Sequence, residues 1–410
     1  MSVATSVDVR TYNVGGVELP RPFQIRRLGH FGLNVDRTAQ CVDFYRRHLG
    51  LRLSDMLDYR EIFPHLSDIT QLGDPRGYFL RHGTDHHSFV LFDRQVRMGL
   101  DREKRFRPGV TVNQITWQVG SLAEVVAAHA YLAEKGVRIS RAGRDTPGSN
   151  WHIYFFDPDG HTIELFYGIE QIGWNGLSKP KSMYDRGFIE VPPLPQISEQ
   201  MEVVQASARG VDLAAGMQDS PTSTAAYDVE GILLPRPFAV TGIGPARIFV
   251  ADLERSLEFF TGVLGLTVTS RAHVLGEDCA FLRANTEHHS LALYPLALRA
   301  KLRLWEGTTL LSCGFRLGSY SQLRGAVLYL REHGFHMVDL PAELSPGVGY
   351  HAFFREPSGH LIQLYFDMEQ VGAASGIPAA IGYIPFERWP ATVMPSLSTY
   401  RGEPFLGPVG

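Results

Sequence analysis

Three polar side chains interrupt stretches that are otherwise largely apolar. His30 lies in LGHFGLNV, Gln114 in VNQITWQV and Glu164 in HTIELFY, while a histidine pair, His86 and His87, precedes the apolar run SFVLF. Imidazole and carboxylate groups bind divalent cations and carry protons, and an unpaired buried carboxylate is costly. These residue types suit a metal site or an acid–base centre, provided that the fold brings them together.

The two halves of the chain repeat one another. TYNVGGVELPRPFQIRRLG (11–29) returns as AYDVEGILLPRPFAVTGIG (226–244), DHHSFVLF (85–92) as EHHSLALY (287–294), and WHIYFFDPDGHTIELFYGIEQIG (151–173) as YHAFFREPSGHLIQLYFDMEQVG (350–372). The matches keep their order with small changes of spacing, which indicates a tandem duplication. We therefore predict two copies of one domain.

The duplication is an internal control, because a residue needed only by the fold should persist in both copies. The candidate ligands are all lost in the second copy, where His30 becomes Pro245, Gln114 becomes Ser312 and Glu164 becomes Gln363. This comparison predicts a site in the N-terminal copy and a C-terminal copy without metal ligands.

Other candidates persist, so for them a structural role stays open. His86-His87 returns as His288-His289, and His152 returns as His351. Tyr154 becomes Phe353, which removes only the hydroxyl and modestly favours a functional role for it.

Each copy divides again into two modules. An apolar strand is followed by a helix with apolar residues at helical spacing, a glycine that ends the helix (Gly50, Gly136), and further strands. The predicted α+β unit is βαβββ, used four times, over 26–97, 112–170, 241–296 and 308–368. We expect an N-terminal domain with the site (1–174), a linker rich in Pro, Ser, Ala and Gln (175–225), a C-terminal domain (226–372) and a tail (373–410).

Composition excludes several classes of protein. The 410 residues carry 39 Lys and Arg against 43 Asp and Glu, a net charge of −4, which argues against a nucleic-acid partner. No apolar run is long enough to span a membrane, and the first residues lack the apolar core of a signal peptide. Three scattered cysteines fit a cytoplasmic protein without a disulfide framework. A homo-oligomer is possible.

Four βαβββ modules paired into two domains resemble the vicinal oxygen chelate superfamily, which includes glyoxalase I, and most of all its two-domain extradiol dioxygenases. The resemblance covers about 26–170 and 241–372 and rests on LGHFGLNV, FYRRHLGLRLSD, HHSFVLF and IYFFDPDGHTIE. It implies that paired modules form a half-barrel with a metal in its mouth. Two tandem half-barrel domains are therefore expected.

The resemblance also implies a ligand set. The family pattern of two histidines and a glutamate, a facial triad, falls on His30, Gln114 and Glu164, so glutamine stands where a second histidine is expected. His152 is an alternative source of the missing imidazole. A further family histidine is absent, since its window holds 145–147, Asp-Thr-Pro.

The catalytic residues implied by the family are His87, or its neighbour His86, as the acid–base histidine, and Tyr154 as the active-site tyrosine. Trp117, Trp151, Phe156 and Phe166 are candidates to line a pocket for an aromatic ring. The expected cofactor is Fe(II), with Mn(II) or another divalent metal as alternatives, and the expected partners are a small aromatic diol and O₂.

Two other functions stay open. One is a metal-dependent epimerase, isomerase or lyase of the same superfamily, which the mixed His/Gln/Glu set suits. The other is a metal-free module that binds a hydrophobic small molecule, against which the retained Glu164 argues.

Overall fold

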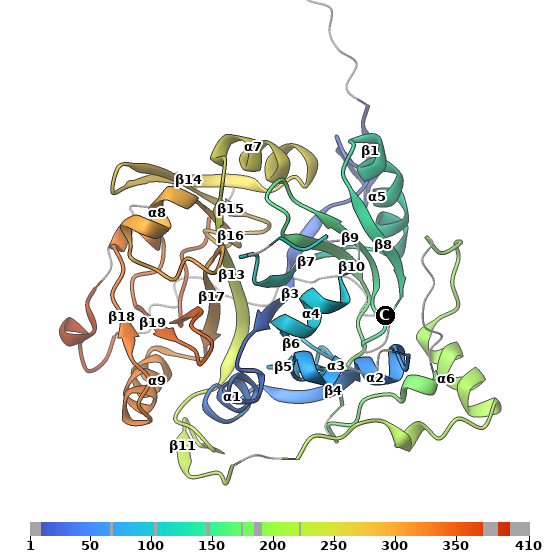
Figure 1. The fold of residues 1–410 in the computed structure, drawn as a ribbon, viewed down its shortest axis with the longest axis horizontal. Coiled ribbons are helices and arrows are strands. Elements are labelled where there is room, and N and C mark those ends of the chain that lie inside the picture. Colours follow the sequence, from blue (N-terminus) through green and yellow to red (C-terminus); the bar gives the residue numbers. More distant parts are fainter. Residues whose placement is uncertain are drawn as a thin grey trace, which may run out of the picture.

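Two eight-stranded sheets dominate the computed structural model, which describes residues 10–65, 69–101, 105–107, 109–144, 148–173, 175–183, 191–220, 223–371 and 384–393 (Figure 1). The first has the order β4 (Arg52–Asp58), β5 (Arg76–Arg81), β6 (Phe89–Asp93), β3 (Ile25–Val35), β7 (Val112–Val119), β10 (Thr162–Tyr167), β9 (Trp151–Phe156) and β8 (Ile139–Arg144). The second repeats this order with β14 (Thr267–Val274), β15 (Glu277–Arg283), β16 (Leu291–Pro295), β13 (Val240–Val250), β17 (Leu310–Leu317), β20 (Leu361–Tyr365), β19 (His351–Arg355) and β18 (Met337–Val338). The predicted α+β fold of four βαβββ modules is confirmed.

Each sheet is built from two modules that meet at an antiparallel pair. β3 pairs in parallel with β6, β7 pairs in parallel with β10, and β3 and β7 run antiparallel to one another. This pattern relates the two modules of a domain by a pseudo-two-fold axis between β3 and β7. Equivalent residues of the two first strands therefore lie close together, which is the arrangement that a shared site needs.

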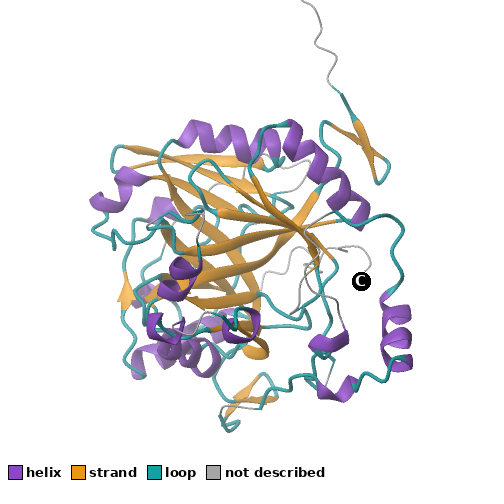
Figure 2. Cartoon of the chain, turned by 45° about the vertical axis from the view of Figure 1, so that its right-hand side comes forward, coloured by secondary structure: helices purple, strands orange, loops and turns teal. Residues whose placement is uncertain are grey.

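The module helices cover the outer faces of the sheets (Figure 2). α5 (Leu122–Glu134) begins where the Ser121 side chain accepts a hydrogen bond from the Glu124 backbone N–H, and Gly136 follows its end with a φ of 70°. Its counterpart α9 (Tyr320–Glu332) is capped in the same way by Ser319. The helices of the other two modules, α1 (Thr38–Asp43) and α7 (Leu253–Leu257), each continue into a π-helical turn, Phe44–His48 and Glu258–Val263.

Shorter elements complete the described chain. Two hairpins precede the sheets, β1 (Tyr12–Val14) with β2 (Val17–Leu19) and β11 (Tyr227–Val229) with β12 (Ile232–Leu234). The short helices are α2 (Tyr59–Ile62), α3 (Ile69–Leu72), α4 (Arg94–Leu100), α8 (Leu296–Lys301) and the 3₁₀ turns Lys181–Met183, Leu213–Ala215, Ala342–Leu344 and Phe386–Arg388.

The structure describes parts of the expected linker (175–225) and of the expected tail (373–410). The linker region carries α6 (Glu199–Ala208) and is held against the N-terminal domain by Asp219, which accepts from Arg46 at 2.6 Å and from the Leu53 N–H at 3.0 Å. In the tail, the Pro390 carbonyl accepts from the Tyr320 hydroxyl at 2.6 Å, so this part packs on its own domain. Residues 372–383 and 394–410 lie outside the described residues.

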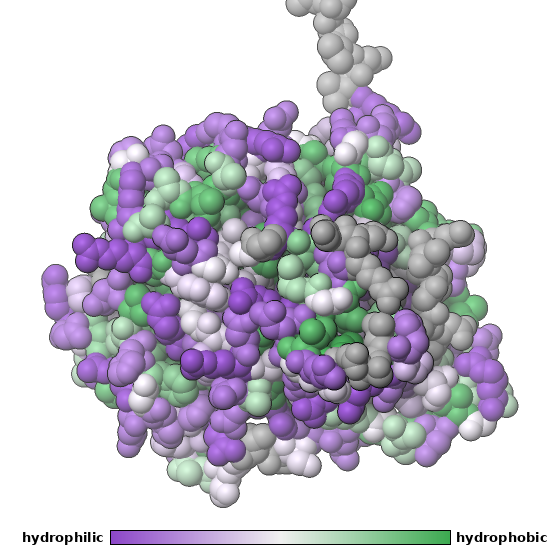
Figure 3. Space-filling view, in the orientation of Figure 1, coloured by the Kyte–Doolittle hydropathy of each residue, from purple (hydrophilic) through white to green (hydrophobic). Residues whose placement is uncertain are grey.

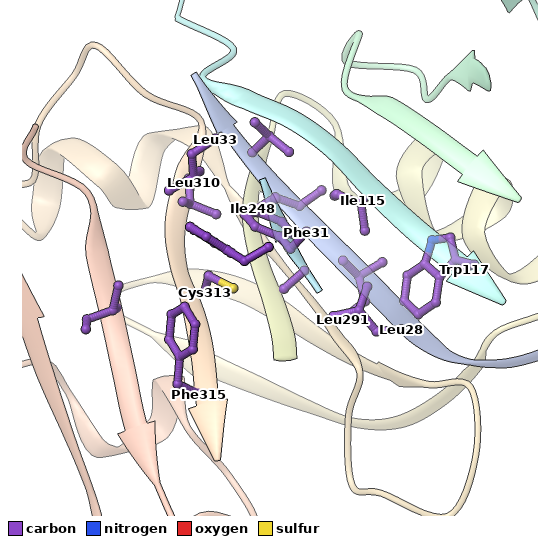
Figure 4. Packing of buried hydrophobic residues seen from close by; sticks show 14 of the residues in the cluster. Leu28, Phe31, Leu33, Ile115, Trp117, Ile248, Leu291, Leu310, Cys313 and Phe315 are labelled. Atoms are coloured by element: carbon purple, nitrogen blue, oxygen red, sulfur yellow. The ribbon is translucent and has the colours of Figure 1, made fainter. Parts of the chain in front are cut away.

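The two domains share one hydrophobic core. Phe31, Leu33 and Ile115 of the first sheet pack with Ile248 and other apolar residues of the second (Figure 4). Cys41 belongs to this core, and all three cysteines are free. The domains are therefore joined by buried apolar surface as well as by the linker.

The repeated His161 and His360 bridge the domains. The His161 Nε2 lies 2.8 Å from the Thr309 hydroxyl of the other copy, and the His360 Nε2 lies 2.9 Å from the Thr111 hydroxyl. The persistence of this histidine in both copies thus has a structural explanation.

The carboxylate of Glu356 is predicted to stabilise this interface. It accepts hydrogen bonds from His360 Nδ1 at 2.7 Å and from Cys41 Sγ at 2.9 Å. Burial raises the pKa of Glu356, but His360, Cys41 and the Ser358 N–H outweigh burial and lower the pKa below its ordinary value of 4.5. Its stabilisation is therefore present above about pH 4.5 and is lost as the pH falls through the lower folded-state pKa.

We expect Glu356→Gln to lower the free energy of unfolding by about 2 kcal/mol at pH 7, and by less at pH 3, as measured by urea unfolding. The exposed Glu254 is the control, because Glu254→Gln should change the stability by less than about 0.5 kcal/mol. An equal loss for Glu356→Gln at both pH values would contradict the ionised state of this carboxylate.

Hydrophilic residues predominate on the face of the molecule drawn in Figure 3, with smaller hydrophobic groups between them. Within the described residues, no helix is long and apolar enough to cross a membrane.

Candidate active site in the N-terminal half-barrel

Strand register brings the predicted ligands together. His30 on β3 lies opposite Thr116 on β7, and Thr116 lies opposite Glu164 on β10, so these three residues form one row across the sheet. In the next row, Gln114 lies opposite Gly32. The pseudo-two-fold axis exchanges the pair His30–Thr116 with the pair Gln114–Gly32. His30 and Gln114 therefore occupy equivalent positions in the two modules.

Four side chains converge on the buried carboxylate of Glu164. Its Oε2 atom lies 3.0 Å from His30 Nε2, 2.9 Å from Thr116 Oγ1 and 3.3 Å from Gln114 Nε2. Its Oε1 atom accepts a hydrogen bond from Asn150 Nδ2 at 2.7 Å. Burial would raise the pKa of Glu164, but His30, His152 and Thr116 outweigh burial and lower the pKa to about 2. The site therefore contains a stable carboxylate anion.

His152 is close to this carboxylate but is oriented by another group. Its Nδ1 atom lies 3.0 Å from the Asn150 carbonyl, which fixes Nδ1 as a donor, and 3.9 Å from Glu164 Oε1. Burial and the charge of Arg141 lower the pKa of His152 to about 3, so its imidazole is neutral. Gln114 and His30 thus approach the same oxygen of Glu164, whereas His152 lies nearer the other oxygen, Oε1.

The histidine pair lies beside His30. The ring of His87 is 4.4 Å from that of His30, and His87 Nδ1 is 3.1 Å from His86 Nδ1, so one of these two nitrogens donates and the other accepts. Burial is the main cause that lowers the pKa of both, to about 3 for His86 and well below the ordinary range for His87. Both are therefore neutral and available for hydrogen bonding.

A cavity of about 400 Å³ opens above these groups. It is lined by Leu57, Tyr59, Ile62, Phe63, Phe79, His87, Phe92, Arg97, Arg105, Phe106, Asn113, Gln114, Ser140, Arg141, Asn150, His152, Tyr154, Phe156 and Thr162. These residues come from both edges and the centre of the first sheet, so the sheet curls around the cavity. His30 and Glu164 are buried and do not line the cavity themselves, but His87, Gln114 and Asn150, which contact them, do.

The aromatic candidates fall in different places. Phe156 lines the cavity, and the ring of Phe166 packs 5.0 Å from that of His30. Trp117 is instead a fully buried core residue, and Trp151 lines a separate cavity of about 540 Å³ beside α6. Tyr154 lies in the cavity wall with its ring 4.7 Å from His152.

Two of the spacings between candidate donor atoms suit a divalent metal held by three protein atoms. Adjacent ligand atoms at about 2.1 Å from a metal and at right angles are about 3 Å apart, and His30 Nε2 and the Gln114 amide lie 3.0 and 3.3 Å from Glu164 Oε2. Rotation of the amide would turn its oxygen toward the same point. Among the described residues, no group of three or more His, Cys, Asp or Glu side chains is placed to hold a metal ion, so the candidate set depends on the amide of Gln114 as its third ligand.

Two residues near the carboxylate were missed by sequence reasoning. Thr116 follows Gln114 by two positions, so the alternation along a strand could have revealed it. Asn150 precedes β9 in a loop, and no periodicity in the sequence points to it. The segment 145–147, where a further family histidine was expected, lies outside the described residues.

The second copy differs at each of these positions. Arg247 lies opposite Ser312 there, as Gly32 lies opposite Gln114 in the first copy. Its fully buried side chain donates to His289 at 3.1 Å, while Nε and NH1 have no hydrogen-bond partner among the described residues. A buried guanidinium therefore lies beside His289 and the ring of Phe353, which are the counterparts of His87 and Tyr154 in the first copy.

The fold consists of paired βαβββ modules, and comparison with known families identifies the family to which such a chain belongs. The chain belongs to the Glyoxalase/Bleomycin resistance protein/Dioxygenase superfamily, whose sequence profile matches residues 27–165 and 242–364. The suspected family is thus confirmed.

Individual relatives are distant. The chain is 29% identical to metapyrocatechase 2 of Cupriavidus necator over 36% of this chain and 38% of the relative. It is 26% identical to the 2,2',3-trihydroxybiphenyl dioxygenase of Sphingomonas paucimobilis over 32% of this chain and 44% of the relative, so it spans less than half of either. The Mn(II)-bound glyoxalase from Novosphingobium aromaticivorans shares the fold, with a TM-score of 0.54, 16% identity and 86% coverage of both chains. The chain is therefore distantly homologous to extradiol ring-cleaving dioxygenases.

Proposed function

We propose that this protein is a metal-dependent extradiol-type dioxygenase that cleaves the ring of a catechol-like aromatic diol in the N-terminal half-barrel. The observation that carries the proposal is the convergence of His30 and Gln114 on one oxygen of Glu164, with Gln114 also lining an aromatic cavity. Distant homology to dioxygenases supports the reaction class. A bound metal, Fe(II) or otherwise Mn(II), would supply Lewis-acid chemistry and open positions for the diol and O₂.

The residues of the cavity would bind and orient the diol. Phe79, Phe92 and Phe156 present an apolar wall that suits a planar ring and excludes water. The ring can lie there with its hydroxyl groups toward the Gln114 end of the cavity. Thr116 and Asn150 would hold the Glu164 carboxylate in place.

Two side chains are positioned to handle protons. His87 is neutral and lines the cavity, so one ring nitrogen can accept a proton from a substrate hydroxyl while His86 fixes the orientation of the imidazole. Burial and the charge of Glu164 raise the pKa of Tyr154. Its hydroxyl therefore stays protonated and can donate a hydrogen bond either to Glu164 or to a substrate oxygen.

The direct test is to purify the protein without oxygen, measure its metal content by mass spectrometry and follow oxygen uptake with a panel of catechols. We expect about one iron or manganese per chain and consumption of oxygen in proportion to the catechol cleaved. Protein that contains no metal and takes none up would contradict the proposal and favour a metal-free binding module.

A second function is favoured by one observation, the neutral amide of Gln114 in place of an imidazole. An epimerase, isomerase or lyase could use a divalent metal ion at this site without consuming O₂. The oxygen atoms of Gln114 and Glu164 would give a ligand set that suits a metal acting only as a Lewis acid. Bound metal without oxygen uptake on any catechol would support this alternative.

A further inference from the structure

The second half-barrel has three polar side chains on one face of its sheet. Arg247 on β13 lies opposite Ser312 on β17. Gln363 on β20 lies opposite Gly314, which is two residues further along β17. Successive side chains of a strand alternate between the faces of a sheet, so Arg247, Ser312 and Gln363 share one face. All three are fully buried.

The guanidinium of Arg247 has more donors than the surrounding residues accept. Its NH2 group donates to His289 Nε2 at 3.1 Å, while Nε and NH1 have no hydrogen-bond partner among the described residues. The ring of Phe353 lies 5.7 Å from the guanidinium, where it attracts the charge but gives these donors no conventional acceptor. The hydroxyl of Ser312 is also buried without a partner among the described residues. Buried donors in this number call for an acceptor.

No described carboxylate balances the charge of Arg247. Burial lowers the pKa of Arg247, and the groups that act in the opposite direction are Tyr294, Tyr365 and Cys313, none of which is a carboxylic acid. An arginine nevertheless keeps its proton inside a protein. Burial is also the main cause that lowers the pKa of His289 well below its ordinary range, so this partner is neutral. The interior of this half-barrel therefore contains a positive charge that its described residues leave uncompensated.

The equivalent positions of the first half-barrel carry the opposite charge. Gly32 has no side chain where the second copy has Arg247, and Glu164 is a buried anion where the second copy has the neutral Gln363. One half-barrel thus combines a carboxylate with side chains that suit a cation. The other combines a guanidinium with a side chain that has lost the carboxylate, and this combination suits an anion.

We propose that the second half-barrel binds a small monovalent anion of the halide class at Nε and NH1 of Arg247, with the Ser312 hydroxyl as a further donor. One such ion would neutralise the guanidinium and accept its remaining hydrogen bonds, which are strong when the donor is charged and buried. Full burial of these residues favours a single atom such as chloride over an organic acid. The anion is a structural ligand of the second copy, and the proposal is independent of the dioxygenase in the first.

Thermal unfolding in two salts tests the proposal. The protein is dialysed into sodium chloride or sodium gluconate at the same ionic strength of about 0.1 M, and gluconate is too large to be enclosed. A ligand that binds only the folded state raises Tm, so we expect Tm to be higher in chloride by about 3 °C and to level off as chloride is added. Crystals grown in bromide should show an anomalous scattering peak beside Nε and NH1 of Arg247.

Variants assign the effect to Arg247. Arg247→Met should abolish the rise in Tm that chloride produces. Arg271→Met is the control, because Arg271 is an exposed arginine of the same domain that pairs with Glu254 at 2.8 Å, and this variant should retain the rise. Gln363→Glu restores a carboxylate on the face that holds Arg247 and should also abolish the rise, so it provides the test should Arg247→Met fail to fold.

Three results would overturn the proposal. Equal Tm values in chloride and gluconate would leave water as the partner of the guanidinium, and so would bromide crystals without a peak beside Arg247. A rise in Tm that persists in Arg247→Met would place the ion elsewhere. None of these measurements involves a metal or a catechol, so their failure leaves the proposed function untouched, and a failure of the proposed function leaves the anion site untouched.

Discussion

Glu164→Gln is expected to lower the affinity for iron or manganese by about 100-fold or more and to abolish oxygen uptake with catechols. Glu164 is the one anionic group of the candidate ligand set, and its pKa of about 2 keeps it charged at every physiological pH. Loss of a partner that only orients a ligand costs about 10- to 100-fold in affinity, so loss of the charged ligand itself should cost at least the upper value. Metal content after dialysis, measured by mass spectrometry, is the readout.

Two controls make this experiment specific. Glutamine is the residue that the second copy has at the equivalent position, where Gln363 donates to Ser345 Oγ at 3.2 Å, so the half-barrel accommodates this side chain. Thr116→Val removes one hydrogen bond to Glu164 and should lower the affinity by about tenfold. If Glu164→Gln retains its metal, the ligand set proposed for the N-terminal half-barrel is wrong.

His87→Gln is expected to lower kcat by about 100- to 10,000-fold, the usual contribution of a general acid–base group, with little change in metal content. The reason is its place in the cavity wall beside His30, where a neutral imidazole can accept a proton from the diol. Steady-state oxygen uptake and metal analysis on the same preparations separate the chemical step from metal binding.

The duplicated pair supplies the matched control for this variant. His288 and His289 have the same arrangement, with Nδ1 atoms 3.0 Å apart, in a half-barrel where the buried Arg247 donates a hydrogen bond to His289. If His87 serves catalysis, His289→Gln should leave kcat unchanged. A purely structural pair predicts instead that the two variants lose stability alike in thermal unfolding and that His87→Gln retains its kcat once folded.

The sequence alone determined the architecture, because periodicity and repetition are local properties. Offsets between matching segments revealed two copies, and the end of α5 is followed by Gly136, the glycine that the sequence pattern indicates. The equivalence of His30 and Gln114 also followed from their places in the repeated first strands. Strand register then put them on either side of the pseudo-two-fold axis.

Only the tertiary structure decided what surrounds these residues. Asn150 reaches Glu164 from a loop, Arg97 enters the cavity from a short helix, and Arg247 donates to His289 in the second half-barrel. None of these contacts has a signature in the sequence, because they join segments whose separation along the chain is unrelated to any helical or strand period. The orientation of the His152 ring, which the Asn150 carbonyl sets, is a further contact of this kind. Distances between side chains are set by how the sheet curls, and that curvature is a property of all eight strands together.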